Sequence, residues 1–169
     1  MAEQMTRVGA TARWIAAARA LETESANPLF RDPYARALAG DDGFALLDDM
    51  RRVAGPTAAG GGPDLYLSLR TKVLDDGLLT RVRDHGLTQV VLLAAGMDTR
   101  AFRVPWPDGV TVYELDRDDV FDVKEPVLAA MSARPTCVRK VIRVDLAGDW
   151  VPSLRAAGFD ASRPTAFLT

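Results

Sequence analysis

The pattern of hydrophobic and polar positions changes once along the chain, near Gly86. Before Gly86, helix-forming residues and apolar positions at helical spacing predict helices. The expected helices cover residues 7–24, residues 33–40, a segment that begins at Asp41, and a long segment from Asp64 to Gly86. Residues 54–63 (AGPTAAGGGP) separate the last two and predict a linker, because glycine and proline interrupt regular structure.

After Gly86, four apolar runs rich in β-branched residues predict strands. They are residues 88–95, 110–115, 136–144 and 165–169, and residues 117–132 and 151–158 have the pattern of helices. Strands that alternate with helices indicate a parallel sheet built from βαβ units. Pro126 is expected to bend the helix over 117–132 or to break its hydrogen bonding.

The predicted fold class is therefore α/β, a partial doubly wound parallel sheet preceded by an N-terminal helical region. We expect a helical cap over residues 1–86 and an incomplete α/β sheet over residues 87–169. The last apolar run reaches Thr169 without a helix to cover it, and a bare sheet edge promotes association. The sequence thus predicts a fragment that lacks C-terminal strands and is marginally stable on its own.

Charge and composition narrow the range of partners. The formal net charge is -2, from 21 basic and 23 acidic residues, which gives no reason to expect a nucleic acid or an anionic membrane as partner. The single cysteine, Cys137, provides no internal disulfide, and no apolar block at the N-terminus resembles a signal peptide. We therefore expect a cytoplasmic protein.

The segment LLAAGMDTRAFR, residues 92–103, is the strongest candidate for a ligand site. An apolar strand runs into Gly96, and Asp98 and Thr99 can cap a following turn of helix. Parallel sheets bind ligands where strands end at their carboxyl edge, and a glycine lets a ligand approach the backbone. The alternative is an ordinary strand-to-helix turn, since many such turns contain a glycine.

Acidic residues end the next two predicted strands. Asp116 lies 20 residues after Gly96 and Glu114 lies 18 after it, near the spacing of a ribose-binding carboxylate. Asp145, with the backbone N–H of Leu146, could bind an adenine ring. The alternatives are a helix cap for Asp116 and a strand-end turn for Asp145. Other residues suggest less: His85 is placed at a helix end, Cys137 in a strand, and no group has metal-ligand spacing.

Five segments occur in an order and spacing that resemble the leucine carboxyl methyltransferase-like family, in particular its bacterial branch. They are NPLFRDPYA, SLRTKVLDD, VVLLAAGMDTRAFRVPWP, TVYELD and RVDL. The resemblance covers essentially the whole chain, but only about the first half of a family member. It implies a Rossmann-like class I methyltransferase fold with S-adenosyl-L-methionine at the carboxyl edge of the sheet.

The resemblance also implies roles for individual residues. Asp116 is similar to the family's ribose-binding acid, Asp145 and Leu146 to its adenine-binding pair, and Gly96 to its glycine after the first strand. Arg70 resembles the arginine that pairs with the methionyl carboxylate of the cofactor, a task that suits the guanidinium fork. No residue is assigned to catalysis, and the methyl acceptor stays open, with a carboxylate as the suggestion.

Two other functions compete with an active methyltransferase. A nicotinamide-dependent oxidoreductase would need G-x-G-x-x-G after the first strand, and the turn AAGMDTRAF has a single glycine. A truncated, non-catalytic relative that retains part of the cofactor site is the second alternative. A hydrolase triad is not expected, because the chain has one histidine and no G-x-S-x-G segment.

Overall fold

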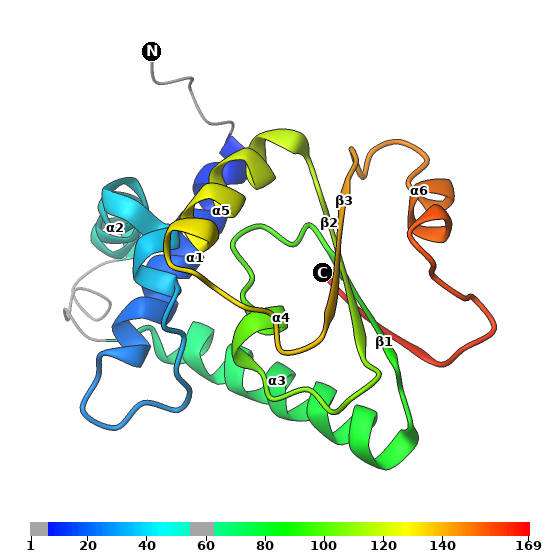
Figure 1. Cartoon of the computed structure of the whole chain (residues 1–169). Helices are drawn as coiled ribbons and strands as arrows, with labels where there is room; N and C mark the ends of the chain where they lie inside the picture. Colours follow the sequence, from blue (N-terminus) through cyan, green and yellow to red (C-terminus); the bar gives the residue numbers. More distant parts are fainter. Residues whose placement is uncertain (1–6, 55–62) are drawn as a thin grey trace.

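The computed structural model describes residues 7–54 and 63–169, so residues 55–62 of the predicted linker lie outside the described residues. Three helices precede the sheet: α1 (Arg7–Thr23), α2 (Ala35–Ala54) and α3 (Leu65–His85). α1 packs against α2, and α3 runs from these two helices along the sheet (Figure 1). The helices expected over 33–40 and from Asp41 form the two parts of α2, because Gly40 has non-helical dihedrals (φ 57°, ψ 180°).

The long predicted helix has the ends expected for it. The Asp64 side chain accepts a hydrogen bond from the Leu67 N–H at 2.9 Å, and Gly86 closes the helix in the left-handed conformation. Leu67, Leu78 and Val82 are buried, whereas Leu65 is exposed. Leu67, Leu78 and Val82 therefore form part of the buried stripe of α3.

Four parallel strands follow α3 in the spatial order β3-β2-β1-β4. They are β1 (Gln89–Leu93), β2 (Thr111–Asp116), β3 (Val138–Arg143) and β4 (Thr165–Leu168). Val91 is aligned with Tyr113 of β2 on one side and with Phe167 of β4 on the other. This topology confirms the predicted parallel sheet, and each predicted strand is present within two residues at either end.

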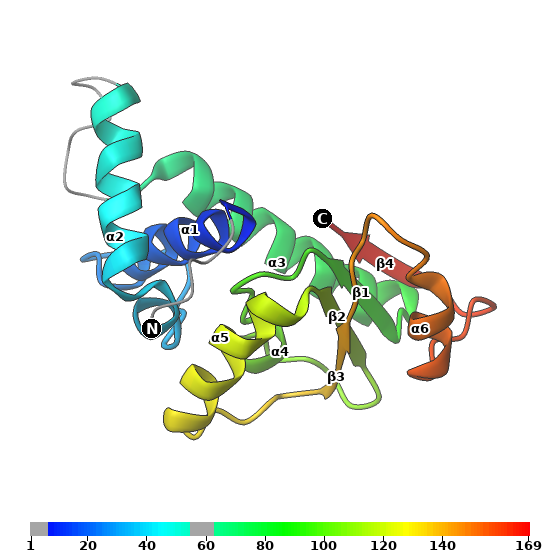
Figure 2. The ribbon, with the colours of Figure 1, turned by 90° about the horizontal axis from the view of Figure 1, so that it is seen from above.

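Helices cover the two faces of the sheet unequally. α3, α4 (Arg100–Arg103) and α5 (Asp118–Ala130) lie on one face, and α6 (Val151–Ala156) lies on the other (Figure 2). Alternate strand residues pack on opposite faces of the sheet. Val90 and Val112 belong to the core beneath α3 and α5, whereas Val91 and Leu115 pack with Leu154 of α6. The sheet is thus the middle layer of an α/β arrangement.

The helix α5 is a single helix that includes Pro126. The helix continues through Pro126, and the expectation that Pro126 bends it stays a prediction. Proline removes its own N–H donor, but the helix buries Phe121 and Leu128 on either side of it, and Pro126 itself is exposed. Packing on both sides of the proline therefore outweighs its local cost.

A single hydrophobic cluster extends from the N-terminal helices to the sheet. It includes Ala16 of α1, Leu47 of α2, Leu78 of α3 and Val90 of β1. The division of the chain into residues 1–86 and 87–169 stays a prediction. Among the helices of the described ranges, none combines the length and the apolar character needed to cross a membrane.

Candidate functional site

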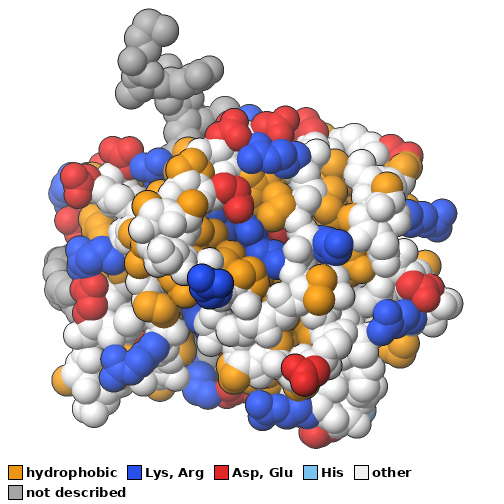
Figure 3. Space-filling view, viewed as in Figure 1, with side chains coloured by type: hydrophobic (Ala, Val, Ile, Leu, Met, Phe, Trp, Pro, Cys, Tyr) orange, Lys and Arg blue, Asp and Glu red, His pale blue; other side chains and the backbone are white. Residues whose placement is uncertain are grey.

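A cavity of about 180 Å³ lies at the carboxyl edge of the sheet, between α1, α3 and the turn after β1. It brings together two of the residues predicted from the sequence, Arg70 and Gly96. Basic side chains gather near the centre of the face seen in Figure 3, among hydrophobic side chains. The lining consists of Ala12, Ile15, Arg19, Arg70, Thr71, Leu74, residues 92–98, Arg100, Arg103, Leu168 and Thr169.

Gly96 occupies a position that no other residue could take without a shift. Its φ is 50°, in the left-handed region that side chains disfavour. A Cβ at this position would lie 2.9 Å from the Cβ of Ala12 in α1, closer than two carbon atoms normally approach. The absence of a side chain at Gly96 therefore lets helix α1 pack closely against the turn. It also leaves the backbone accessible at the end of β1.

Asp116 and Glu114 have different environments at the end of β2. One oxygen of Asp116 accepts from the Gly96 N–H at 2.7 Å, and the other accepts from the Arg117 N–H at 2.8 Å. Glu114 is fully buried and bonds the Lys124 Nζ at 2.7 Å and Arg139 at 2.7 Å. Of the two acids, only Asp116 contacts the glycine turn.

Asp145 and Leu146 follow β3 at the same edge of the sheet but lie outside the cavity lining. Asp145 is exposed, and its side chain accepts from the Ala147 N–H at 2.9 Å. Leu146 packs against the cluster beneath α6. The backbone N–H of Val144 donates to the Asp116 carbonyl at 2.8 Å, so the end of β3 is tied directly to the end of β2.

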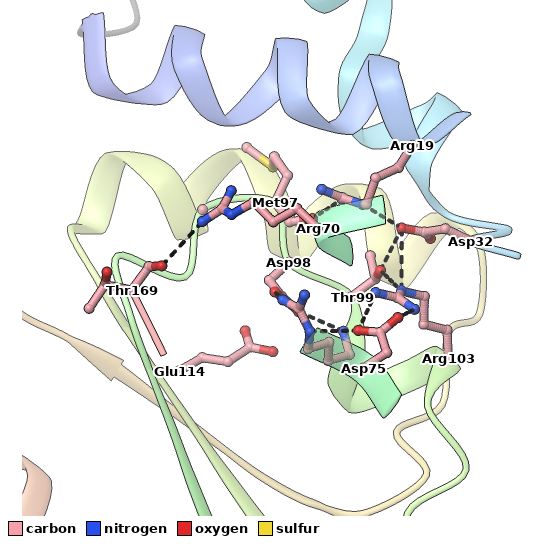
Figure 4. Close-up of polar contacts among 12 residues, drawn as sticks. Arg19, Asp32, Arg70, Asp75, Met97, Asp98, Thr99, Arg103, Glu114 and Thr169 are labelled. Atoms are coloured by element: carbon pink, nitrogen blue, oxygen red, sulfur yellow. Dashed lines mark hydrogen bonds and ion pairs between the residues drawn. The ribbon is translucent and has the colours of Figure 1, made fainter. Parts of the chain in front are cut away.

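Six charged side chains form a network behind the glycine turn, which we call the turn network (Figure 4). Its three cations and three anions are paired with one another, so that its formal charge is zero. The members are Arg19, Asp32, Asp75, Asp98, Arg100 and Arg103.

Arg70 differs from the arginines of the turn network. No Asp or Glu side chain of residues 7–54 or 63–169 forms an ion pair with it, and its guanidinium contacts the backbone oxygen of Thr169 at 3.4 Å (Figure 4). It is exposed on α3 at the rim of the cavity. Because the other cavity arginines are already neutralised by aspartates, Arg70 supplies the uncompensated positive charge.

Asp98 is the carboxylate of the turn network that lines the cavity. Burial opposes its ionisation, but the attraction of neighbouring cations, Arg100 foremost, outweighs burial and lowers its pKa to about 2. Its side chain also accepts from the N–H of Arg100, the first residue of α4, at 2.7 Å, although the N-cap residue of α4 is Thr99, whose side chain makes no capping bond. Thr99, the other predicted cap, donates its hydroxyl to Asp32 instead, at 2.6 Å.

Sequence reasoning did not single out Asp32 or Asp75. Asp32 has a fully buried side chain, and Asp75 is nearly as buried. Both lie in segments already quoted for the family resemblance, NPLFRDPYA and SLRTKVLDD. The available signal was the presence of arginines in DTRAFR that would need buried carboxylate partners, but the sequence does not state which acids these are.

The remaining candidate residues have surroundings that suit a role in the fold. His85 is exposed at the end of α3. Cys137 precedes β3 and is half-buried, and burial raises the pKa of its thiol to about 11, with Glu114 adding to the effect. Trp106 is buried and donates its indole N–H to the Arg100 carbonyl at 2.9 Å, so it packs the loop after α4. Within the described ranges, no group of three or more His, Cys, Asp or Glu residues could hold a metal ion.

The parallel sheet and the residues at its carboxyl edge define an α/β protein of the Rossmann-like class. The sequence profile of the leucine carboxyl methyltransferase family matches residues 12–169. The chain belongs to this family, which confirms the resemblance read from its five segments.

Three curated relatives are similar over nearly the whole chain, and each bears the name "Putative S-adenosyl-L-methionine-dependent methyltransferase". The protein from Mycobacterium ulcerans is 44% identical over 95% of this chain and 52% of its own length. The protein from Mycobacteroides abscessus is 42% identical over 97% and 56%, and that from Mycobacterium tuberculosis is 44% identical over 96% and 55%. The chain thus spans about half the length of these relatives.

Proposed function

We propose that the chain forms the cofactor-binding part of an S-adenosyl-L-methionine-dependent methyltransferase. The observation that carries the proposal is Arg70, an uncompensated cation that shares one cavity with the glycine turn after β1. The names of the relatives support the same reading.

The residues at the carboxyl edge fit the chemical groups of this cofactor. Arg70 would bind the methionyl carboxylate, for which a guanidinium offers two parallel donors. Asp116 would accept the ribose hydroxyls, because each of its oxygens uses one lone pair for a backbone N–H and keeps another. Asp145 and the N–H of Leu146 would bind the adenine ring at the end of the neighbouring strand.

The bound cofactor would supply an activated methyl group, so the task of the protein is to hold donor and acceptor in line. Gly96 and Asp116 would fix the nucleoside against the sheet, and Arg70 would fix the opposite end. A carboxylate acceptor would need no strong general base, which suits a chain whose one histidine lies at the far end of α3. The acceptor, the cytoplasmic location and the expectation of no nucleic-acid or membrane partner stay predictions.

Isothermal titration of the chain with S-adenosylhomocysteine, the demethylated cofactor, and separately with NAD tests the proposal. We expect heat from S-adenosylhomocysteine and none from NAD. Arg70→Gln should weaken binding by about tenfold or more, since it removes a charge-assisted contact. Arg83→Gln serves as the matched control, because Arg83 is an exposed arginine on the same helix outside the cavity.

Binding of NAD alone would replace the proposal with an oxidoreductase. Equal effects of the two arginine substitutions would remove Arg70 from the site. Binding of S-adenosylhomocysteine without methyl transfer to any carboxylate acceptor would favour the truncated, non-catalytic alternative.

A further inference from the structure

The turn after β1 is held by bonds from several directions. Gly96 donates its N–H to Asp116, and the Asp98 side chain binds the first residue of α4. The other two residues of the turn, Met97 and Thr99, are held from the N-terminal helical region. Arg19 of α1 donates to the Met97 carbonyl at 2.5 Å, and the Thr99 hydroxyl donates to Asp32 at 2.6 Å.

Both of these bonds depend on one buried carboxylate oxygen. The same Oδ2 atom of Asp32 accepts from the Thr99 hydroxyl and, at 2.9 Å, from Nε of Arg19 (Figure 4). Asp32 is itself fixed in the loop between α1 and α2. Its N–H donates to the Thr23 hydroxyl at 2.9 Å, and its other carboxylate oxygen accepts from the Tyr34 N–H at 3.2 Å.

We infer that Asp32 is a positioning residue of the cofactor site, which acts through Arg19 and Thr99 to fix the backbone of the turn over residues 96–99. The inference rests on the proposed function for the identity of the ligand. It assigns a role to the Asp in NPLFRDPYA and makes the geometry of the turn depend on the N-terminal helices. Asp32 lies outside the cavity lining, so its effect on a ligand is indirect.

Thr99 provides the sharpest test because its shape can be kept while its hydroxyl is removed. Thr99→Val deletes the donor to Asp32 and the acceptor for Nε of Arg103 at 3.1 Å, whereas Thr99→Ser keeps the hydroxyl. Asp32→Asn removes the shared charge, and Glu24→Gln is the control. The Glu24–Arg36 pair is an exposed ion pair within the same helical region and does not touch the turn.

Two measurements on the full chain distinguish positioning from general stability. The first is the affinity for S-adenosylhomocysteine by calorimetry. The second is hydrogen–deuterium exchange of the segment 94–99, compared with strand residues 89–93. Thr99→Val and Asp32→Asn should each weaken binding about tenfold and speed exchange in 94–99 by a similar factor, with 89–93 unchanged. Thr99→Ser and Glu24→Gln should stay within about threefold of wild type.

Affinity and exchange in 94–99 that stay at wild-type values in both Thr99→Val and Asp32→Asn would overturn the inference. So would uniform acceleration of exchange across both segments, which indicates a loss of global stability alone. If the wild-type chain binds no S-adenosylhomocysteine but Thr99→Val still accelerates exchange selectively in 94–99, the proposed function fails and the role of Asp32 in the turn stands. If Asp32→Asn does not fold, the pair Thr99→Val and Thr99→Ser still decides the question.

Discussion

Two largely buried sets of charged side chains lie on the same face of the sheet and differ in what they hold. The turn network joins helices α1, α3 and α4 to an irregular turn. The second set, which we call the strand network, joins β2, α5 and β3 and consists of Glu114, Lys124, Glu125 and Arg139. Both sets contain equal numbers of cations and anions.

The two networks are satisfied to different degrees. In the strand network, one oxygen of Glu114 and Nε of Arg139 are buried without a hydrogen-bond partner, whereas no buried side-chain atom of the turn network is left in this way. A regular strand and helix keep their positions by backbone bonds and packing, so partial satisfaction is tolerated there. A turn without regular backbone bonding needs its side-chain partners, and this turn is where the candidate ligand site lies.

The largest expected effect is on the free energy of unfolding and concerns the strand network. Glu114→Ala leaves the fully buried Lys124 without its carboxylate and should lower the free energy of unfolding by about 3–5 kcal/mol. The double variant Glu114→Leu with Lys124→Met should recover more than half of that loss, because a buried pair can be replaced by apolar groups. Urea denaturation measures both. Additive losses in the double variant would show that the ion pair itself is not what matters.

Cofactor affinity should depend more on Asp116 than on Glu114. Asp116→Ala removes the acceptor that faces the glycine turn, and should weaken binding of S-adenosylhomocysteine by about 1.5–3 kcal/mol. Glu114→Gln, which keeps the shape of the side chain, should change affinity by less than about threefold in the folded protein. Calorimetry on protein shown by circular dichroism to be folded provides the comparison. A larger effect at Glu114 would transfer the ligand role to that residue.

Acid should weaken the turn network through Asp98. Its pKa is lowered from 3.8 to about 2, so its contribution to stability is present above pH ~4 and is lost as the pH falls towards 2. The shift corresponds to about 2 kcal/mol. Between these pH values, wild type should therefore lose about 2 kcal/mol more than Asp98→Asn in urea titrations. Parallel pH profiles of the two proteins would contradict this assignment.

The smallest expected effect concerns backbone strain beside the turn. Ala94 has a φ of 53°, a left-handed conformation that costs an alanine roughly 1–2 kcal/mol. Ala94→Gly should relieve this cost, offset in part by the greater freedom of glycine in the unfolded chain, for a net gain below about 1 kcal/mol. The control Ala95→Gly should destabilise, because Ala95 is buried and lacks a positive φ. Thermal unfolding of both variants makes the comparison, and a stabilised Ala95→Gly would refute it.

The sequence predicted the features that depend on neighbouring residues. Apolar, β-branched runs located all four strands, because strand propensity and burial on both faces leave a local pattern. Asp64 and Gly86 marked the ends of α3 for a similar reason, since capping involves residues a few positions apart. The family segments then led to Arg70, Gly96 and Asp116, two of which the fold brings into one cavity.

Only the tertiary structure decided which charges neutralise one another. Thr99 and Asp32 are separated by 67 residues, and Arg19 and Met97 by 78, so no periodicity relates them. The pairing of Glu114 with Lys124 and the lone charge of Arg70 likewise follow from which side chains the packing brings within bonding distance. Local preferences determine helices and strands, but the balance of charge in a buried site is a sum over all segments that meet there, and that sum exists only in the folded chain.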